Sequence, residues 1–222
     1  RVSFQATVKK PQGSNMKAFQ VLPPNYHPSG KFDLKNLKQI IILNLIGLIL
    51  LIFSIWSFSW IANQIRSGSD ISISIEFSSI PSALIALGKL LLTIIFVLGL
   101  HEGIHALFFW IFSKQKPVVG IKGFYAFTAM PGWYFPRNQY ILIGISPLIV
   151  ITLVGILLLV IMPISTLNLI LIGLILNASG AVGDLFVVIW LLTKPVNTLA
   201  LDQIDTIEFY VPQSNISSSK ID

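Results

Sequence analysis

The chain contains no cysteine among its 222 residues. This absence excludes disulfide bonds, and it also excludes thiolate ligands from any metal site. A metal ion bound to this protein must therefore be held by histidine, aspartate or glutamate side chains. Histidine is itself scarce, with three in the whole sequence.

Charged residues are also few. They make up 11% of the sequence, whereas a soluble domain carries about 25%. Hydrophobic residues account for 54% and the mean hydropathy is +0.81, which predicts an integral membrane protein. The net charge of +6 comes from basic residues beside the apolar segments, so we expect contact with the lipid bilayer rather than with nucleic acid.

Four apolar segments are long enough to cross a bilayer, which takes about 20 residues. We therefore predict an all-α membrane protein with four transmembrane helices and short cytosolic β-prone segments. The predicted spans cover about 39–61, 82–112, 140–162 and 167–192, the last two joined by a tight turn at 163–166. The predicted domain organisation is a cytosolic N-terminal segment, a four-helix transmembrane domain and a cytosolic tail, at 1–38, 39–192 and 193–222.

Outside the spans, several short segments have the composition of strands. Apolar and polar residues alternate at 71–77, and β-branched or aromatic residues are frequent at 2–8, 118–128 and 206–211. Lysine and arginine are concentrated in the N-terminal segment, in the loop 113–138 and after the last span. By the positive-inside rule, we expect a multi-pass protein of the cell membrane with both termini in the cytosol.

The ionisable residues within the predicted spans are Lys89, His101, Glu102, His105 and Asp184. Charge in the hydrocarbon region is costly and is usually functional. His101 and His105 are four positions apart and share one helix face, so they could bind one metal ion together. Glu102 lies beside them, where it could activate a water molecule on that metal. Lys89 is near the end of its span and is expected to reach the headgroups.

Depth connects these histidines with the last span. At the helical rise, His105 and His101 lie about 10 and 16 Å below the cytosolic end of their span, and Asp184 lies about 12 Å below the end of its own. We therefore predict Asp184 as the third metal ligand. The alternatives are a helix–helix hydrogen bond and an ion pair with Lys89. Asn177 precedes Asp184 by two helical turns; it could orient substrate or stabilise an oxyanion, or it could form an interhelical amide bond.

The His101-Glu102-Gly103-Ile104-His105 motif, with an aspartate on a later span, resembles the site-2-protease-like intramembrane zinc metalloproteases. More narrowly, segments 101–109, 177–184 and 205–212 are similar to a putative zincin peptidase family. The resemblance implies a zinc ion (Zn2+) held by His101, His105 and Asp184, with Glu102 as the general base. The sequence departs from the site-2 pattern because Asp184 is followed by Leu185 and because no PDZ-like domain is present.

The predicted function is an intramembrane zinc metalloprotease that cleaves peptide or membrane-protein substrates near the cytosolic side. A metal transporter or sensor, or an inactive protease-like scaffold, are the alternatives. A transporter would also place histidine and aspartate in the bilayer, but it would not need Glu102. The β-prone loop at 118–128 could add an unwound substrate as a further strand, or it could be an interfacial loop held by aromatic residues.

Overall fold

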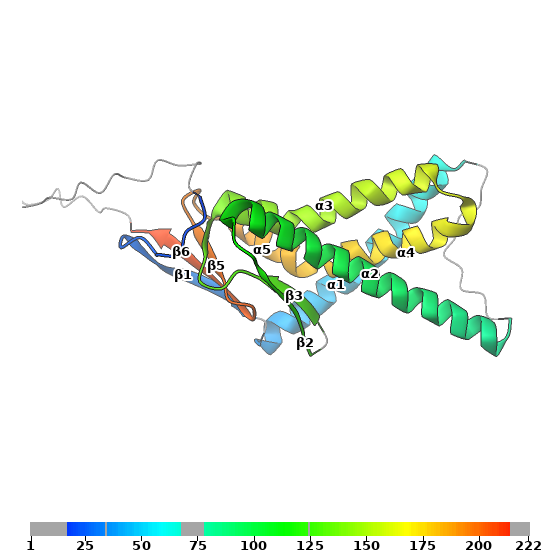
Figure 1. Ribbon diagram of the computed structural model, residues 1–222, viewed down its shortest axis with the longest axis horizontal. Coiled ribbons are helices and arrows are strands. Elements are labelled where there is room, and N and C mark those ends of the chain that lie inside the picture. The colour runs from blue at the N-terminus through cyan, green and yellow to red at the C-terminus, as the bar shows by residue number, and fades with distance from the viewer. Residues whose placement is uncertain (1–16, 34, 68–77, 124, 214–222) are drawn as a thin grey trace, which may run out of the picture.

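The computed structural model describes residues 17–33, 35–67, 78–123 and 125–213. Two of the segments expected to be strands, 2–8 and 71–77, lie outside these ranges. The described chain forms a bundle of long helices with a small antiparallel sheet at one end (Figure 1).

Within these described ranges, three helices are long and apolar enough to cross a membrane: α1 (Leu37–Ile65), α2 (Ile80–Ser113) and α3 (Arg137–Ile161). The first two cover their predicted spans and extend beyond them at both ends, while α3 begins three residues before its predicted span and ends one residue short of it. Polar caps set where the first two begin. Asn36 accepts hydrogen bonds from the amides of the first turn of α1, and Ser79 forms a capping box with Ser82 at the start of α2.

The prediction of one continuous fourth span is wrong in detail. The chain forms α4 (Ile164–Gly180) and α5 (Val182–Leu192), which meet at Ala181 with a bend of 45°. Gly180 and Gly183 flank the bend, and glycine weakens a helix by about 1 kcal/mol relative to alanine. The two helices together are apolar and long enough to count as one broken span. The expected turn at 163–166 is present as the first turn of α4, where the backbone N–H of Thr166 donates to the carbonyl oxygen of Pro163 at 3.0 Å.

The expectation of an all-α protein with short β-prone segments needs correction as well. Four strands pair into one antiparallel sheet in the order β1-β6-β5-β4, and two form a separate hairpin. The sequence could not reveal this sheet, because its strands are short and pair across most of the chain. The sheet consists of β1 (Tyr26–Asp33), β4 (Tyr134–Pro136), β5 (Leu199–Asp202) and β6 (Thr206–Pro212); the hairpin consists of β2 (Val118–Lys122) and β3 (Tyr125–Ala129).

One core joins the sheet to the helix ends. Phe135 and Phe209 of the sheet are buried together with Phe109 of α2 and Leu191 of α5. Within the bundle α3 and α5 approach closely, since a Cβ atom added at Gly144 would lie 2.9 Å from a methyl carbon of Val188. This packing fixes the ends of α2, α3 and α5 relative to one another beneath the sheet.

Two arginines bind the carboxyl ends of neighbouring helices. Arg66, which follows α1, donates hydrogen bonds to the carbonyl oxygens of Leu159 (2.9 Å) and Met162 (2.7 Å) at the end of α3. Arg137 does the same at the end of α5, with bonds to Leu191 (2.7 Å) and Leu192 (3.0 Å). A cation at this position satisfies free carbonyls and interacts favourably with the helix dipole.

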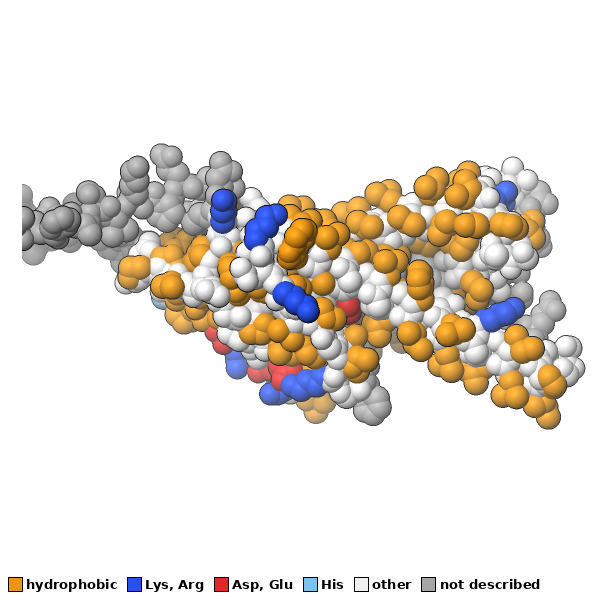
Figure 2. All heavy atoms as spheres, in the orientation of Figure 1, with side chains coloured by type: hydrophobic (Ala, Val, Ile, Leu, Met, Phe, Trp, Pro, Cys, Tyr) orange, Lys and Arg blue, Asp and Glu red, His pale blue; other side chains and the backbone are white. Residues whose placement is uncertain are grey.

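The surface differs between the long helices and the end that carries the sheet and hairpin. In Figure 2 hydrophobic side chains cover the long helices, while most of the charged side chains on this face gather near the sheet and the hairpin. Exposed apolar side chains run along α1, α2 and α3, as expected for surfaces that face lipid. The helices are therefore consistent with a multi-pass membrane protein, and the sheet and hairpin form its polar end.

Candidate metal centre

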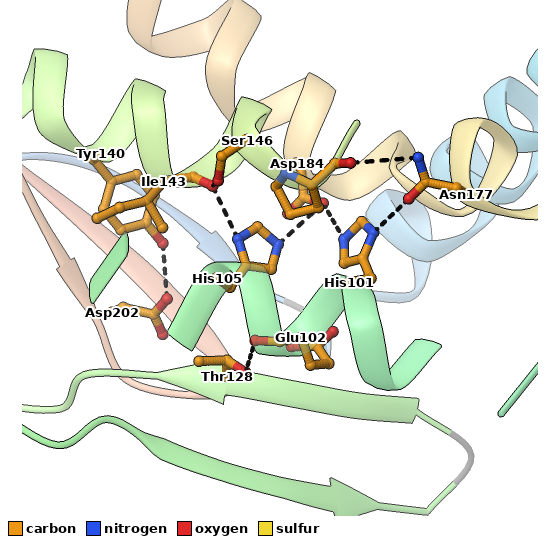
Figure 3. Close-up of polar contacts among 11 residues, drawn as sticks. His101, Glu102, His105, Thr128, Tyr140, Ile143, Ser146, Asn177, Asp184 and Asp202 are labelled. Carbon is orange, nitrogen blue, oxygen red and sulfur yellow. Dashed lines mark hydrogen bonds and ion pairs between the residues drawn. The ribbon is translucent and has the colours of Figure 1, made fainter. Parts of the chain in front are cut away.

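Three side chains from α2 and α5 meet between the helices (Figure 3). The Nε2 atom of His101 lies 3.0 Å from Oδ2 of Asp184, and the Nε2 atom of His105 lies 3.5 Å from the same oxygen. The two imidazole rings are 4.9 Å apart and nearly perpendicular. The bend at Ala181 matters here, because it places Asp184 in the first turn of α5, where the helix dipole favours a carboxylate.

The other ring nitrogen of each histidine is also bonded, and this fixes the direction of both rings. Nδ1 of His105 donates to the carbonyl oxygen of Ile143 in α3 at 2.9 Å. Nδ1 of His101 donates to Oδ1 of Asn177 in α4 at 3.0 Å. Since both oxygens can only accept, each Nδ1 carries a proton, and each Nε2 is directed towards the Asp184 carboxylate.

Asn177 is almost completely buried, with 2% of its surface exposed. Its side-chain nitrogen donates to the carbonyl oxygen of Pro147 at 3.5 Å, while its oxygen accepts from His101. The side chain thus forms interhelical bonds from α4 to both α2 and α3, the second of the two roles considered for it from the sequence.

Glu102 lies on the side of α2 that faces the hairpin (Figure 3). Its backbone carbonyl accepts a hydrogen bond of 3.0 Å from the hydroxyl of Thr128 in β3, which holds the hairpin against this turn of the helix. Thr128 and Glu102 both line the cavity that also contains the two histidines and Asp184. Glu102 therefore lines the same cavity as the two histidines, on the side of the helix that faces β3.

A cavity of about 980 Å³ contains this site. Its volume is at the upper end of the range usual for ligand pockets. Its walls come from helices α1 to α5, the hairpin and the sheet, and the apolar part includes Leu48 and Leu51 of α1 together with Val97 and Leu98 of α2. The cavity thus joins three converging acidic and imidazole side chains to a mainly apolar chamber.

A donor set of two imidazoles and one carboxylate suits a zinc ion, which binds nitrogen and oxygen at about 2.0–2.2 Å. Ligand atoms of a tetrahedral site with such bonds are about 3.3 Å apart. The separations of 3.0 and 3.5 Å are close to this value, and the ligand atoms of all three residues lie within 4.8 Å of one another. The three residues therefore fit a zinc ion with a fourth position left for water or substrate.

Two residues at this site were missed by the sequence analysis. Asp202 of β5 and Tyr140 of α3 line the cavity, and the tyrosine hydroxyl donates to Oδ2 of Asp202 at 2.8 Å. Burial raises the pKa of Asp202 to about 6. No motif marks either residue, because Asp202 belongs to a tail in which carboxylates are common and tyrosine is frequent at membrane interfaces.

An ionic cluster ties the hairpin to the sheet at the edge of the cavity. Asp205, in the turn between β5 and β6, accepts from Lys122 (2.5 Å) and from the hydroxyl of Tyr125 (2.9 Å) at the tip of the hairpin. Lys35 lies 3.1 Å from the same carboxylate. These partners, with Lys122 as the main cause, hold the pKa of Asp205 well below its usual range. We call this group, Lys35, Lys122, Tyr125 and Asp205, the hairpin latch.

Comparison with known proteins identifies one family. Residues 94–199 match the family model described as "Putative zincin peptidase", which confirms the narrower of the two resemblances predicted from the sequence. The matched range includes His101, Glu102, His105, Asn177 and Asp184. No curated protein and no solved structure matches the chain.

Proposed function

From the zincin peptidase match over residues 94–199, we propose that the protein is an intramembrane zinc metalloprotease of the site-2-protease type. A zincin peptidase implies zinc and hydrolysis of peptide bonds. The observation that carries the proposal is the meeting of His101, His105 and Asp184 beside Glu102 in one cavity.

In this proposal His101, His105 and Asp184 hold the zinc ion through the two Nε2 atoms and the carboxylate. The bound ion would lower the pKa of a water molecule and polarise the substrate carbonyl. The Glu102 carboxylate accepts the proton from the water and then gives it to the nitrogen of the leaving amine. Asn177 and Ile143 keep the imidazoles in the tautomer that leaves Nε2 free, a role typical of groups outside the direct ligands.

We propose that substrates are membrane proteins or peptides that reach the site from the bilayer. The cavity wall formed by α1 and α2 is apolar, and the exposed sides of these helices are apolar as well. Basic residues gather at the end that holds the sheet and hairpin, among them Lys31, Lys35, Lys114, Lys116 and Lys194. By the positive-inside rule this end and both termini face the cytosol, and cleavage takes place near that side.

The hairpin is the proposed guide for the substrate backbone. β3 pairs with β2 along one edge, and Tyr125–Thr128 line the cavity. A transmembrane helix hides its own amides, so it must unwind before hydrolysis. Pairing of the unwound segment along β3 would hold it extended in front of Glu102.

Replacing Glu102 with glutamine tests the proposal against a transporter or an inactive scaffold. Glu102→Gln removes the proton acceptor but none of the proposed ligands, so we expect zinc content to be unchanged and cleavage to fall by about 10²–10⁴-fold. The measurements are zinc analysis of the full chain in detergent, and cleavage of labelled casein and of a reconstituted single-span polyleucine peptide.

Glu208→Gln is the matched control, because Glu208 lies on β6 outside the cavity lining and should affect neither result. Cleavage that survives in Glu102→Gln contradicts the assigned base, and wild-type protein that binds zinc without cleaving either probe favours a transporter or a scaffold. His101→Ala with unchanged zinc content would show that the metal centre itself is misplaced.

A further inference from the structure

Pro147 lies inside α3, in the turn that packs against the candidate metal centre. Proline has no backbone N–H, so it cannot bond to the carbonyl oxygen four residues before it, and its ring pushes that carbonyl outwards. The residue four positions before Pro147 is Ile143. The carbonyl of Ile143 is therefore the one acceptor in this stretch of α3 that the helix leaves without its usual backbone donor.

This same carbonyl is the oxygen that binds His105. Nδ1 of His105 donates to it at 2.9 Å, and the hydroxyl of Ser146 donates to it at the same distance. The contact is buried, since His105 has 7% and Ile143 has 2% of its surface exposed. A buried imidazole N–H needs a hydrogen-bond acceptor. A carbonyl that already accepts a backbone N–H within its helix is a poorer acceptor than one that lacks this donor.

We infer that Pro147 is a positioning residue for the metal centre: by leaving the Ile143 carbonyl without a backbone donor, it fixes the tautomer and direction of His105. The inference rests on the proposed zinc site but concerns a residue that does not touch the metal. The same turn supports the second histidine, because the Pro147 carbonyl accepts from Asn177, which in turn accepts from His101. One turn of α3 thus orients both imidazoles.

Pro147→Ala tests this directly, because alanine restores the N–H that competes for the Ile143 carbonyl. We expect zinc affinity to fall by about 10–100-fold, as is typical when a partner of a metal-bound histidine is lost. The melting temperature of the metal-free protein should stay the same or rise, since alanine favours a helix interior over proline. Zinc affinity is measured by competition with a chelator on the full chain in detergent.

Ser146→Ala is the matched control. It removes the other donor to the same carbonyl but adds no backbone N–H, so its zinc affinity should stay close to that of the wild type. A folded Pro147→Ala variant with wild-type zinc affinity would overturn the inference, as would an equal loss in Ser146→Ala. Failure of the wild type to bind zinc would instead reject the proposed function.

A second measurement needs no metal. The ¹⁵N chemical shifts of the imidazole nitrogens report which one carries the proton. In the metal-free wild type, Nδ1 of His105 should carry a proton, and in Pro147→Ala a form with unprotonated Nδ1 should appear beside it. A wild-type His105 protonated mainly at Nε2 would contradict the inference even if the alanine variant failed to fold.

Discussion

At the scale of single residues, Asp202 is a carboxyl group in a place that strongly disfavours its charge. It is 8% exposed and is bonded to the hydroxyl of Tyr140 and to the backbone N–H of Ile204. Ile204 itself has a φ of 71°, a left-handed conformation that is rare for a β-branched residue. The cavity wall near His105 thus combines a buried acid with a strained turn.

The raised pKa of Asp202 predicts a pH dependence of stability. Folding favours the protonated carboxyl, so the free energy of unfolding should fall as the pH rises from about 3.9, the pKa in the unfolded chain, to about 6 in the folded protein. The shift of about two units corresponds to about 3 kcal/mol. Asp202→Asn cannot ionise, so the metal-free variant should become more stable than the wild type above pH 6, with the difference shrinking towards pH 4.

Unfolding by denaturant at several pH values, in one detergent, gives both curves. The asparagine amide can still accept from Ile204 and donate to the tyrosine oxygen, so the comparison isolates the charge. Parallel pH curves for the two proteins would show that the Asp202 carboxyl does not titrate as its burial implies.

Sequence reasoning succeeded for residues that are rare in their surroundings. His101, His105 and Asp184 were identifiable because so few ionisable residues occur in the spans, and the structure brings these three together. The carbonyl of Ile143 could not be found in this way, since every residue has a carbonyl. Its only signal is a proline four positions later, and that signal has meaning only when a histidine from another helix lies opposite.

At the scale of elements, the hairpin is held over the cavity by charged and polar contacts at its tip. In the hairpin latch one carboxylate, Asp205, binds groups from the hairpin and from the chain before α1. Because the pKa of Asp205 is lowered, these ion pairs should persist as the pH falls through the usual aspartate range and should be lost only below it.

Asp205→Asn should loosen the hairpin without unfolding the bundle. We expect hydrogen exchange of the hairpin amides, residues 118–122 and 125–129, to become at least about tenfold faster, because local opening no longer breaks two ion pairs. Exchange in α3 should not change. Glu208→Gln is the control, since the Glu208 carboxylate accepts from the Tyr210 hydroxyl on its own strand and does not belong to the hairpin latch. Equal exchange rates in wild type and Asp205→Asn would show that the tip contacts do not hold the hairpin.

Hydropathy predicts the positions of the spans, but it does not predict breaks within a span or the pairing of strands. Continuous apolar stretches were enough to place α1, α2 and α3, because length and composition are all that a span requires. They could not reveal the break at Ala181, since both halves of the broken span are equally apolar. The β-prone segments at 118–128 and 206–211 were predicted correctly, but their pairing partners depend on contacts far apart in the sequence.

For the whole molecule, the proposed orientation can be tested because the chain has no cysteine of its own. Lys116 lies at the sheet end and Ser67 just after α1 at the opposite end, and both are exposed. We expect Ser67→Cys to react with a membrane-impermeant maleimide on intact cells and Lys116→Cys to react only after permeabilisation. The reverse pattern would place the sheet outside the cytosol, and labelling of both or neither would contradict a multi-pass arrangement.

His101 and Asp184 are 83 positions apart in the sequence, yet their side chains meet at 3.0 Å. A metal ion held between them would join α2 to the broken last span and close a long loop of the chain. It would act as a cross-link in a protein that has no cysteine and cannot form disulfide bonds. The free energy of unfolding would then rise with the logarithm of the free metal concentration. Catalysis and the stability of the helix bundle would then both depend on the bound metal ion, and a shortage of metal would lower both.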